Sequence, residues 1–334
     1  MSRKSKVSPE LPLKIRLFSS VMTFFIDLSC RPNFTVNRCL FNLIDFKSPP
    51  SKKPTNGVKS SDITVDASRN LWFRLYTPTQ DRDAGDGDSM PIIVFFHGGG
   101  FSFMAANSKP YDDFCRRMAS EIHSIVVSVN YRLSPEHRCP AQYEDCFDVL
   151  KFIDANDSFE GFDNANPKLC FLAGDSAGGN LAHHMAVYAN GYEFSRVNLA
   201  GLVAIQPFFG GQERTESEIN LTGAPFVSVE RMDWIWKAFL PEGSDRDHPV
   251  ANVFGPNSKD ITGLKLPATI VFVGGFDPLK DWQKRYYEGL KKCGKEAYLV
   301  EYPNAIHSFY AYPEVPESAL FIKELKDFME KQAK

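Results

Sequence analysis

A serine lies within the run Gly174-Asp175-Ser176-Ala177-Gly178, a spacing typical of a nucleophile carried on a sharp turn. The mostly apolar run 168–173 before it indicates a buried strand, and residues 180–187 after it indicate a helix. Small residues also recur in ordinary turns, so the five residues alone are weak evidence. Because a strand, a tight turn and a helix would expose the hydroxyl at the edge of a sheet, we predict that Ser176 is a nucleophile.

A serine hydroxyl needs a base that removes its proton. Apart from the adjacent pair His183 and His184, the histidines downstream of Ser176 are His248 and His307. His248 lies in a long irregular stretch, whereas His307 comes just after a strand-like run. A loop at the carboxyl edge of the sheet could reach back from there, so we predict that His307 is the base. The alternative is a structural loop histidine.

A carboxylate should orient that imidazole and stabilise its charged form. Asp277 follows the apolar run 270–273 directly and is the better placed candidate. Asp281 is more typical of the first turn of the next helix, where a carboxylate suits the helix dipole. Glu144 and Asp145 are expected to serve helix and loop structure.

The negative oxygen formed during acyl transfer needs preorganised donors, usually main-chain amides. The run His97-Gly98-Gly99-Gly100 follows the strand-like residues 92–96, and glycines allow a backbone to approach a substrate closely. The run lacks the Gly-Lys-Ser/Thr ending of a phosphate loop. We therefore predict an oxyanion hole, and its donors are the amides of Gly98, Gly99, Gly100 and Ala177.

Elements that could position these residues alternate along the chain, which predicts an α/β protein. Apolar runs alternating with helical patterns indicate a parallel sheet that is covered on both faces. Two further strand candidates precede them, joined by a turn, so an eight-stranded, mostly parallel sheet is expected. The expected strands are residues 58–66, 71–76, 92–96, 125–129, 169–173, 202–205, 270–273 and 298–302, and the expected helices are 111–121, 142–156, 180–190, 281–292 and 318–331.

Several stretches fall outside this alternation. Residues 17–28 have apolar side chains at helical spacing, closed by Asp27 and Arg31 and without a cleavage site, so we predict an amphipathic helix rather than a signal peptide. Residues 32–56 and 79–89 are expected to be loops. The stretch between the strands at 202–205 and 270–273 is too long for a simple crossover, so we predict a helical insertion that packs with the N-terminal helix as a lid.

Composition limits the class of protein. The 334 residues are 43% hydrophobic and 24% charged, with a net charge of −3 and no basic stripe, which argues against nucleic-acid binding. The seven cysteines are odd in number and form no Cys-x-x-Cys pair, so free thiols in a reducing, cytoplasmic compartment are expected. No run is long enough to span a membrane, and no His and carboxylate ligands cluster for a metal. We expect no cofactor, and nothing in the sequence indicates an oligomeric state.

Three motifs resemble one branch of a known family. The sequences His-Gly-Gly-Gly-Phe at 97–101, Gly-Asp-Ser-Ala-Gly-Gly-Asn at 174–180 and Tyr-Arg-Leu-Ser-Pro-Glu-His at 131–137 look like the hormone-sensitive-lipase branch of the α/β-hydrolases, and most like its plant carboxylesterases. The resemblance implies an α/β-hydrolase fold over the single domain 1–334. It also implies ester hydrolysis through an acyl-enzyme on Ser176, with Asp277 and His307.

The gibberellin receptor subgroup of the same family resembles the chain in other places, including residues 31–38, 211–218 and 236–243. In that receptor the N-terminal segment closes over the ligand, which implies lid elements at about 1–45 and 211–250 here. The receptor carries an aliphatic residue in place of His307 and a serine in place of Gly100, and Arg231-Met232 stand where it has Asp-Arg. These departures favour an enzyme, with a hormone-binding module without turnover as the alternative.

The expected substrate is a small or medium apolar ester, because 13% of the residues are aromatic and a lid is predicted. The plant branch includes enzymes that hydrolyse alkaloid methyl esters, and others that act as dehydratases or cyclases. The resemblance therefore suggests an ester of a specialised plant metabolite, whose hydrolysis could be followed by decarboxylation. A substitution at Ser176, Asp277 or His307 would point to the lyase or cyclase chemistry, and none of the three is substituted.

Overall fold

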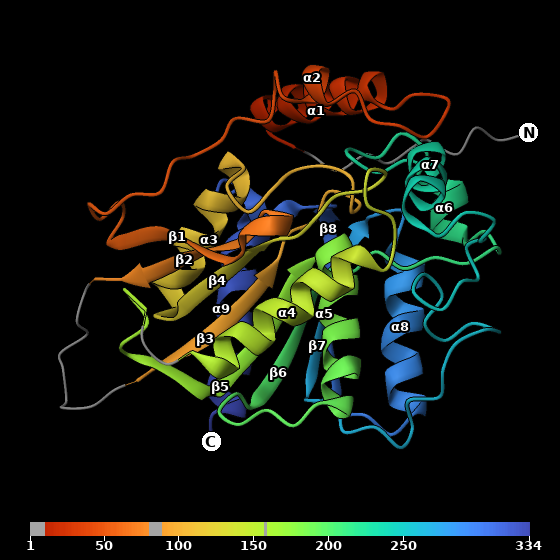
Figure 1. Cartoon of the computed structure of the whole chain (residues 1–334). Helices are drawn as coiled ribbons and strands as arrows, with labels where there is room; N and C mark the ends of the chain where they lie inside the picture. Colours follow the sequence, from red (N-terminus) through yellow and green to blue (C-terminus); the bar gives the residue numbers. More distant parts are fainter. Residues whose placement is uncertain (1–10, 80–88, 157–158) are drawn as a thin grey trace, which may run out of the picture.

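The computed structural model describes residues 11–79, 89–156 and 159–334 of the chain (Figure 1). Its centre is one eight-stranded sheet in the order β1-β2-β4-β3-β5-β6-β7-β8. The pairs β1–β2 and β2–β4 are antiparallel, and the remaining pairs are parallel. The predicted mostly parallel sheet is therefore confirmed. The strands are β1 (Val58–Asp66), β2 (Leu71–Pro78), β3 (Met90–Phe96), β4 (Ile125–Asn130), β5 (Ala165–Asp175), β6 (Leu199–Ile205), β7 (Thr269–Phe276) and β8 (Ala297–Ile306).

Helices cover both faces of this sheet, because successive side chains of each strand point to opposite sides. In β3, Ile92 and Val94 face the core under α4, α5 and α8, whereas Ile93 and Phe95 face the core under α3 and α9. The first group of helices lies in front of the sheet in Figure 1. The bounds are α3 (Lys109–Ile122), α4 (Ala141–Ala155), α5 (Ala177–Tyr188), α8 (Lys280–Lys292) and α9 (Pro316–Gln332).

The remaining helices lie at the carboxyl edge of the parallel strands. Figure 1 shows α1 (Leu13–Ser29) and α2 (Arg38–Phe41) above that edge, with α7 (Val229–Phe239) and α6 (Glu216–Asn220) beside them. The prediction of a loop over 32–56 is wrong at α2, where the Asn37 side chain accepts a hydrogen bond from the Leu40 amide and caps one helical turn. Most of the predicted loop 79–89, and residues 1–10 of the predicted lid, lie outside the described residues.

Polar contacts attach α1 and α2 to the rest of the molecule. The guanidinium of Arg231 on α7 donates to the Asp27 carboxylate on α1 at 2.7 and 2.9 Å. The indole of Trp234, also on α7, donates to the Arg31 carbonyl at 2.8 Å. Arg38 on α2 donates to the Ser134 carbonyl at 2.7 Å. The N-terminal helices are therefore fixed to α7 and to the loop after β4.

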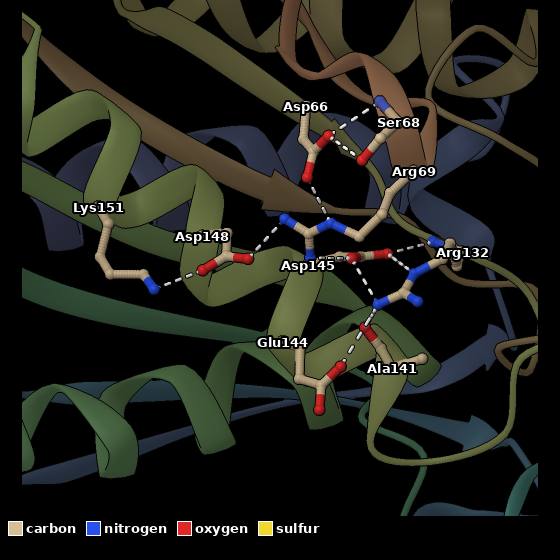
Figure 2. Close-up of polar contacts among 9 residues, drawn as sticks. All are labelled: Asp66, Ser68, Arg69, Arg132, Ala141, Glu144, Asp145, Asp148 and Lys151. Atoms are coloured by element: carbon tan, nitrogen blue, oxygen red, sulfur yellow. Dashed lines mark hydrogen bonds and ion pairs between the residues drawn. The ribbon is translucent and has the colours of Figure 1, made fainter.

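A network of charged residues joins the β1–β2 turn to α4 near the carboxyl end of β4, where Trp72 pairs with Asn130 (Figure 2). The fully buried carboxylate of Asp145 accepts from Arg69 at 3.2 Å and from the Arg132 side chain at 2.8 and 2.9 Å. Glu144 lies at its solvent side, 3.4 Å from Arg132. Asp145 and Glu144 thus have the structural surroundings that the sequence suggested.

Across the described ranges, no helix is both long and apolar enough to cross a membrane. The seven cysteines are all free thiols, as predicted.

Candidate active site

Ser176 occupies the turn between β5 and α5 with φ 52° and ψ −117°. A positive φ is uncommon for a residue with a side chain and costs on the order of 1–3 kcal/mol, so the surrounding structure must hold it. The Ser176 amide donates to the Ile205 carbonyl at 2.8 Å, and the Ser176 carbonyl accepts from the Phe208 amide at 2.8 Å. The β6 end therefore fixes the backbone on both sides of the hydroxyl.

The glycines on either side of Ser176 make this turn sterically feasible. A Cβ on Gly174 would lie 2.2 Å from the Gly178 carbonyl oxygen, and a Cβ on Gly178 would lie 1.8 Å from the Phe96 carbonyl oxygen. Real side chains do not approach backbone atoms so closely, which explains why glycine occurs at both positions.

We expect Gly178→Ala to destabilise the protein by at least about 3 kcal/mol, because neither backbone segment can move without displacing β3 or the turn. Urea unfolding followed by circular dichroism measures the effect. Gly191→Ala is the matched control, since a Cβ there meets no atom within 4 Å, and it should change stability by less than about 0.5 kcal/mol. Equal stability of the two variants would contradict the steric argument.

His307 follows β8, and its imidazole contacts the carboxylate of Asp277, which follows β7. The distance from His307 Nδ1 to Asp277 Oδ2 is 2.7 Å, and both side chains are buried. The Asp277 carboxylate also accepts from the Leu279 amide at 2.9 Å and from the side chain of Gln283 at 2.8 Å. This carboxylate is therefore held rigidly, and it fixes the orientation of the ring.

Gln206 is a site residue that the sequence analysis missed. Its side-chain nitrogen donates to Asp277 at 3.0 Å and to the Ile306 carbonyl at 3.1 Å, while its oxygen accepts from the Ser308 amide at 2.8 Å. It thus holds the carboxylate and the residues on both sides of His307. Its position directly after the strand 199–205 was the available signal, because carboxyl ends of parallel strands meet at one edge.

The protonation of His307 is set by opposing effects. Burial lowers the pKa of this imidazole, but the nearby charges of Asp277 and Asp175 and the hydrogen bond that His307 donates to Asp277 outweigh it, so the pKa is raised. The carboxylates thus favour the charged form of the ring, which is the form a base reaches after it takes a proton.

The glycine loop after β3 places its three glycines differently. Gly99 and Gly100 line the cavity that contains Ser176 and His307. The Gly98 amide instead donates to Asp175 Oδ1 at 2.8 Å and lies 2.8 Å from the Tyr111 hydroxyl. Ala177 is the first residue of α5, where helix amides have no partner within the helix.

The cavity has a volume of about 380 Å³ and mostly apolar walls. Ser176, His307, Gly99 and Gly100 are among the residues that line it. Its walls come from the helices at the carboxyl edge and from the loops beside them. The apolar lining includes Phe18, Met22 and Ile26 of α1, Phe41 of α2, Met232 and Ile235 of α7, and Phe103, Met104, Phe208, Phe226, Val227 and Leu279.

The competing candidates lie elsewhere. His248 accepts a hydrogen bond from the nearby Val250 amide at 3.3 Å and does not line the cavity. Asp281 is in the first turn of α8 and accepts from the Ser217 amide at 2.7 Å. His183 is buried against Tyr286. Among the residues that the structure describes, no group of His, Cys, Asp or Glu could hold a metal ion.

Comparison with known proteins gives consistent results. Residues 93–311 match the family described as having the alpha/beta hydrolase fold, and residues 47–136 match the carboxylesterase family. The chain is 43% identical over 315 residues to the gibberellin receptor GID1C of Arabidopsis thaliana, covering 91% of this chain and 90% of that protein. It is 35% identical over 290 residues to carboxylesterase 20 of the same plant, covering 85% and 88%.

Solved structures of esterases share the fold. The hyperthermophilic esterase of the archaeon Pyrobaculum calidifontis is 26% identical with a TM-score of 0.71, over 97% of this chain and 95% of that chain. The ester-hydrolase EH1AB1 from the Lake Arreo metagenome is 26% identical with a TM-score of 0.74, over 96% and 98%.

Proposed function

This chain belongs to the alpha/beta-hydrolase fold family, and on that premise we propose that it is a serine carboxylesterase. One observation carries the proposal: the imidazole of His307 is bound to the buried Asp277 and lines the same cavity as Ser176. A serine, a histidine and a carboxylate in this relation are the groups that acyl transfer needs.

In the proposed reaction, Ser176 Oγ attacks the ester carbonyl carbon while His307 Nε2 takes the hydroxyl proton. His307 then returns this proton to the departing alcohol, which leaves an acyl group on Ser176. Water attacks that acyl group with His307 again as base, and the carboxylic acid is released. Asp277 keeps Nδ1 protonated, so that Nε2 is free to act.

We assign the oxyanion donors to the amides of Gly99, Gly100 and Ala177. Each such donor is typically worth about 2.7–4 kcal/mol of barrier. The sequence also suggested the Gly98 amide as an oxyanion donor. We do not assign it that role, because this amide already donates to Asp175.

The raised pKa of His307 predicts where activity falls in acid. The base must be neutral, so kcat/KM should decrease as pH falls through the pKa of His307, which lies above the ordinary imidazole value of 6.5. The measurement is kcat/KM for an uncharged p-nitrophenyl ester between pH 5 and 9. An acid limb with its midpoint well below 6.5 would contradict the effect of the two carboxylates.

We also propose that residues 1 to about 45 and about 211–250 form a lid on a single hydrolase domain. Support comes from α1, α2 and α7, which contribute side chains to the cavity wall, and from the ion pair between Asp27 and Arg231. Seven free thiols suit a reducing compartment, so we place the protein in the cytoplasm.

The substrate that we propose is a small or medium apolar ester. An apolar cavity of about 380 Å³ is in the range of small-molecule sites, and it leaves the acyl or alcohol group surrounded by aromatic and aliphatic side chains. A methyl ester of a specialised plant metabolite such as an alkaloid has this chemistry. Its hydrolysis would give a carboxylic acid, and decarboxylation could follow where the acid is unstable.

A fluorophosphonate probe tests the proposal, because it reacts with a serine only when that serine is activated. We expect one covalent adduct, mapped by mass spectrometry to Ser176, and turnover of at least some members of a panel of apolar esters. The alternative is a hormone-binding module without turnover, favoured by the 43% identity to a gibberellin receptor. No adduct, together with tight binding of a gibberellin-like acid, would overturn the enzyme proposal.

A further inference from the structure

Asp175, the residue before the nucleophile, is a buried carboxylate for which the reaction described above has no use. Removing a carboxylate from water costs free energy unless hydrogen bonds or opposite charges compensate. A carboxylate that is buried between segments of a catalytic site, despite this cost in free energy, is expected to have a function in that site. The hydrogen bonds of Asp175 indicate this function.

The hydrogen bonds of Asp175 come from two other segments of the site. The Gly98 amide of the glycine loop donates to Oδ1 at 2.8 Å, and the Tyr111 hydroxyl of α3 donates to Oδ2 at 3.0 Å. The Tyr310 hydroxyl, three residues after His307, makes a further side-chain hydrogen bond to the carboxylate. One carboxylate therefore contacts both the oxyanion loop and the histidine loop, while its own backbone precedes Ser176.

The glycine loop is shaped around this carboxylate. A Cβ on Gly98 would lie 2.4 Å from Asp175 Oδ2 and 2.8 Å from the Tyr111 hydroxyl oxygen. Gly98 is thus required for close approach to Asp175. The hydrogen bond from the Gly98 amide to Asp175 then fixes the position of the backbone that carries the next two amides, those of Gly99 and Gly100.

We propose that Asp175 is a positioning residue for ester hydrolysis: it ties the glycine loop and the histidine loop to the turn that carries Ser176. This inference rests on the function proposed above and adds a residue to it. Asp175 touches no reacting atom. It acts by setting the distance between the nucleophile, the oxyanion donors and the base.

The charge of Asp175 adds a second effect on His307. The charged groups that act on this imidazole are Asp277 and Asp175, and the hydroxyls of Tyr111 and Tyr310, which also bind Asp175, stay neutral because burial raises their pKa values. Burial raises the pKa of Asp175 to about 6, while hydrogen bonds from both tyrosines and the charge of His307 oppose the rise. Above pH 6 the carboxylate is therefore mainly ionised and supports the charged imidazolium.

The variant Asp175→Asn tests both effects, because it removes the charge with little change in volume. We expect kcat to fall by about 100-fold, close to the loss of one oxyanion donor, and KM to change by less than about threefold. The acid limb of kcat/KM should also move to lower pH, because one of the two charges that raise the pKa of His307 is gone. A purely structural residue would not move that limb.

Asp145→Asn is the matched control, since Asp145 is an equally buried carboxylate, with arginine partners (Figure 2). It does not line the cavity. This variant should lower thermal stability and leave both kcat and the acid limb of the folded protein unchanged; if it does not fold, Asp148→Asn takes its place. An Asp175→Asn enzyme with wild-type kcat and an unmoved acid limb would overturn the proposal. The same shift in the control variant would overturn it too.

If Asp175→Asn does not fold, Tyr111→Phe and Tyr310→Phe keep the test decisive. Each removes one donor to the carboxylate, and each should lower kcat by about three- to tenfold in a folded protein. Wild-type kcat in both would overturn the proposal. Failure of the enzyme proposal itself looks different, because the wild-type protein would then neither react with the fluorophosphonate nor hydrolyse any ester.

Discussion

Replacing Ser176 with alanine is expected to lower kcat for a p-nitrophenyl ester by about a millionfold, down to the residual rate that the oxyanion hole and binding provide. The variant has no nucleophile, because Ser176 is the residue between β5 and α5 and its hydroxyl is lost. The same variant should give no adduct with a fluorophosphonate. Because the backbone at this turn is held by the ends of β3 and β6, the fold should be retained.

Ser228→Ala provides the control within the same cavity. Ser228 lines the cavity and caps α7 by accepting from the Arg231 amide, so its loss should cost about 1 kcal/mol of stability without abolishing turnover. The measurement is initial rate against enzyme concentration, with circular dichroism to verify folding. Turnover by Ser176→Ala within tenfold of wild type would rule out the acyl-enzyme mechanism.

Asp277→Asn is expected to have the second largest effect, a fall in kcat of about 10⁴-fold. The carboxylate accepts at 2.7 Å from His307 Nδ1 and also from the side chains of Gln206 and Gln283. An asparagine would present an amide group to these donors, and its own N–H groups favour the tautomer in which Nδ1 accepts. The proton would then sit on Nε2, where it prevents the ring from acting as a base.

Asp281→Asn separates this effect from a general loss of charge near the site. Asp281 is four residues further along, in the first turn of α8, and accepts from the Ser217 amide. We expect its kcat to stay within about threefold of wild type. Both variants are measured with the same ester and checked by thermal unfolding. A larger fall in kcat for Asp281→Asn than for Asp277→Asn would show that Asp281, and not Asp277, is the carboxylate that orients His307.

Several elements followed from local sequence because their signals lie within a few residues. The apolar runs predicted the strands β3 to β7 to within a few residues, and the glycines around Ser176 indicated a turn that no other residue permits. At β8 the alternating run 298–302 predicted only half of the strand, which extends over Ala297–Ile306. The short helix α2 was missed, because one turn has no periodicity and its signal is a single capping asparagine.

Contacts between segments that are distant in the sequence could not be predicted from these local signals. The bond between Gly98 and Asp175 joins residues 77 positions apart, and that between Gln206 and the Ile306 carbonyl joins residues 100 apart. Whether an amide such as that of Gly98 serves a substrate or a carboxylate depends on which strand ends meet at the sheet edge. Composition and periodicity contain no information about that choice.

The amino-acid sequence by itself determined the α/β class, the order of the strands along the chain and the identity of Ser176, Asp277 and His307 as candidates, because residue type and spacing carry these properties. Only the tertiary structure decided that His307 faces Asp277, that Gly98 binds Asp175 and that α1 walls the cavity. The physical reason is that hydrogen bonds act over about 3 Å. They are therefore settled by the packing of strands and helices against one another, and not by distance along the chain.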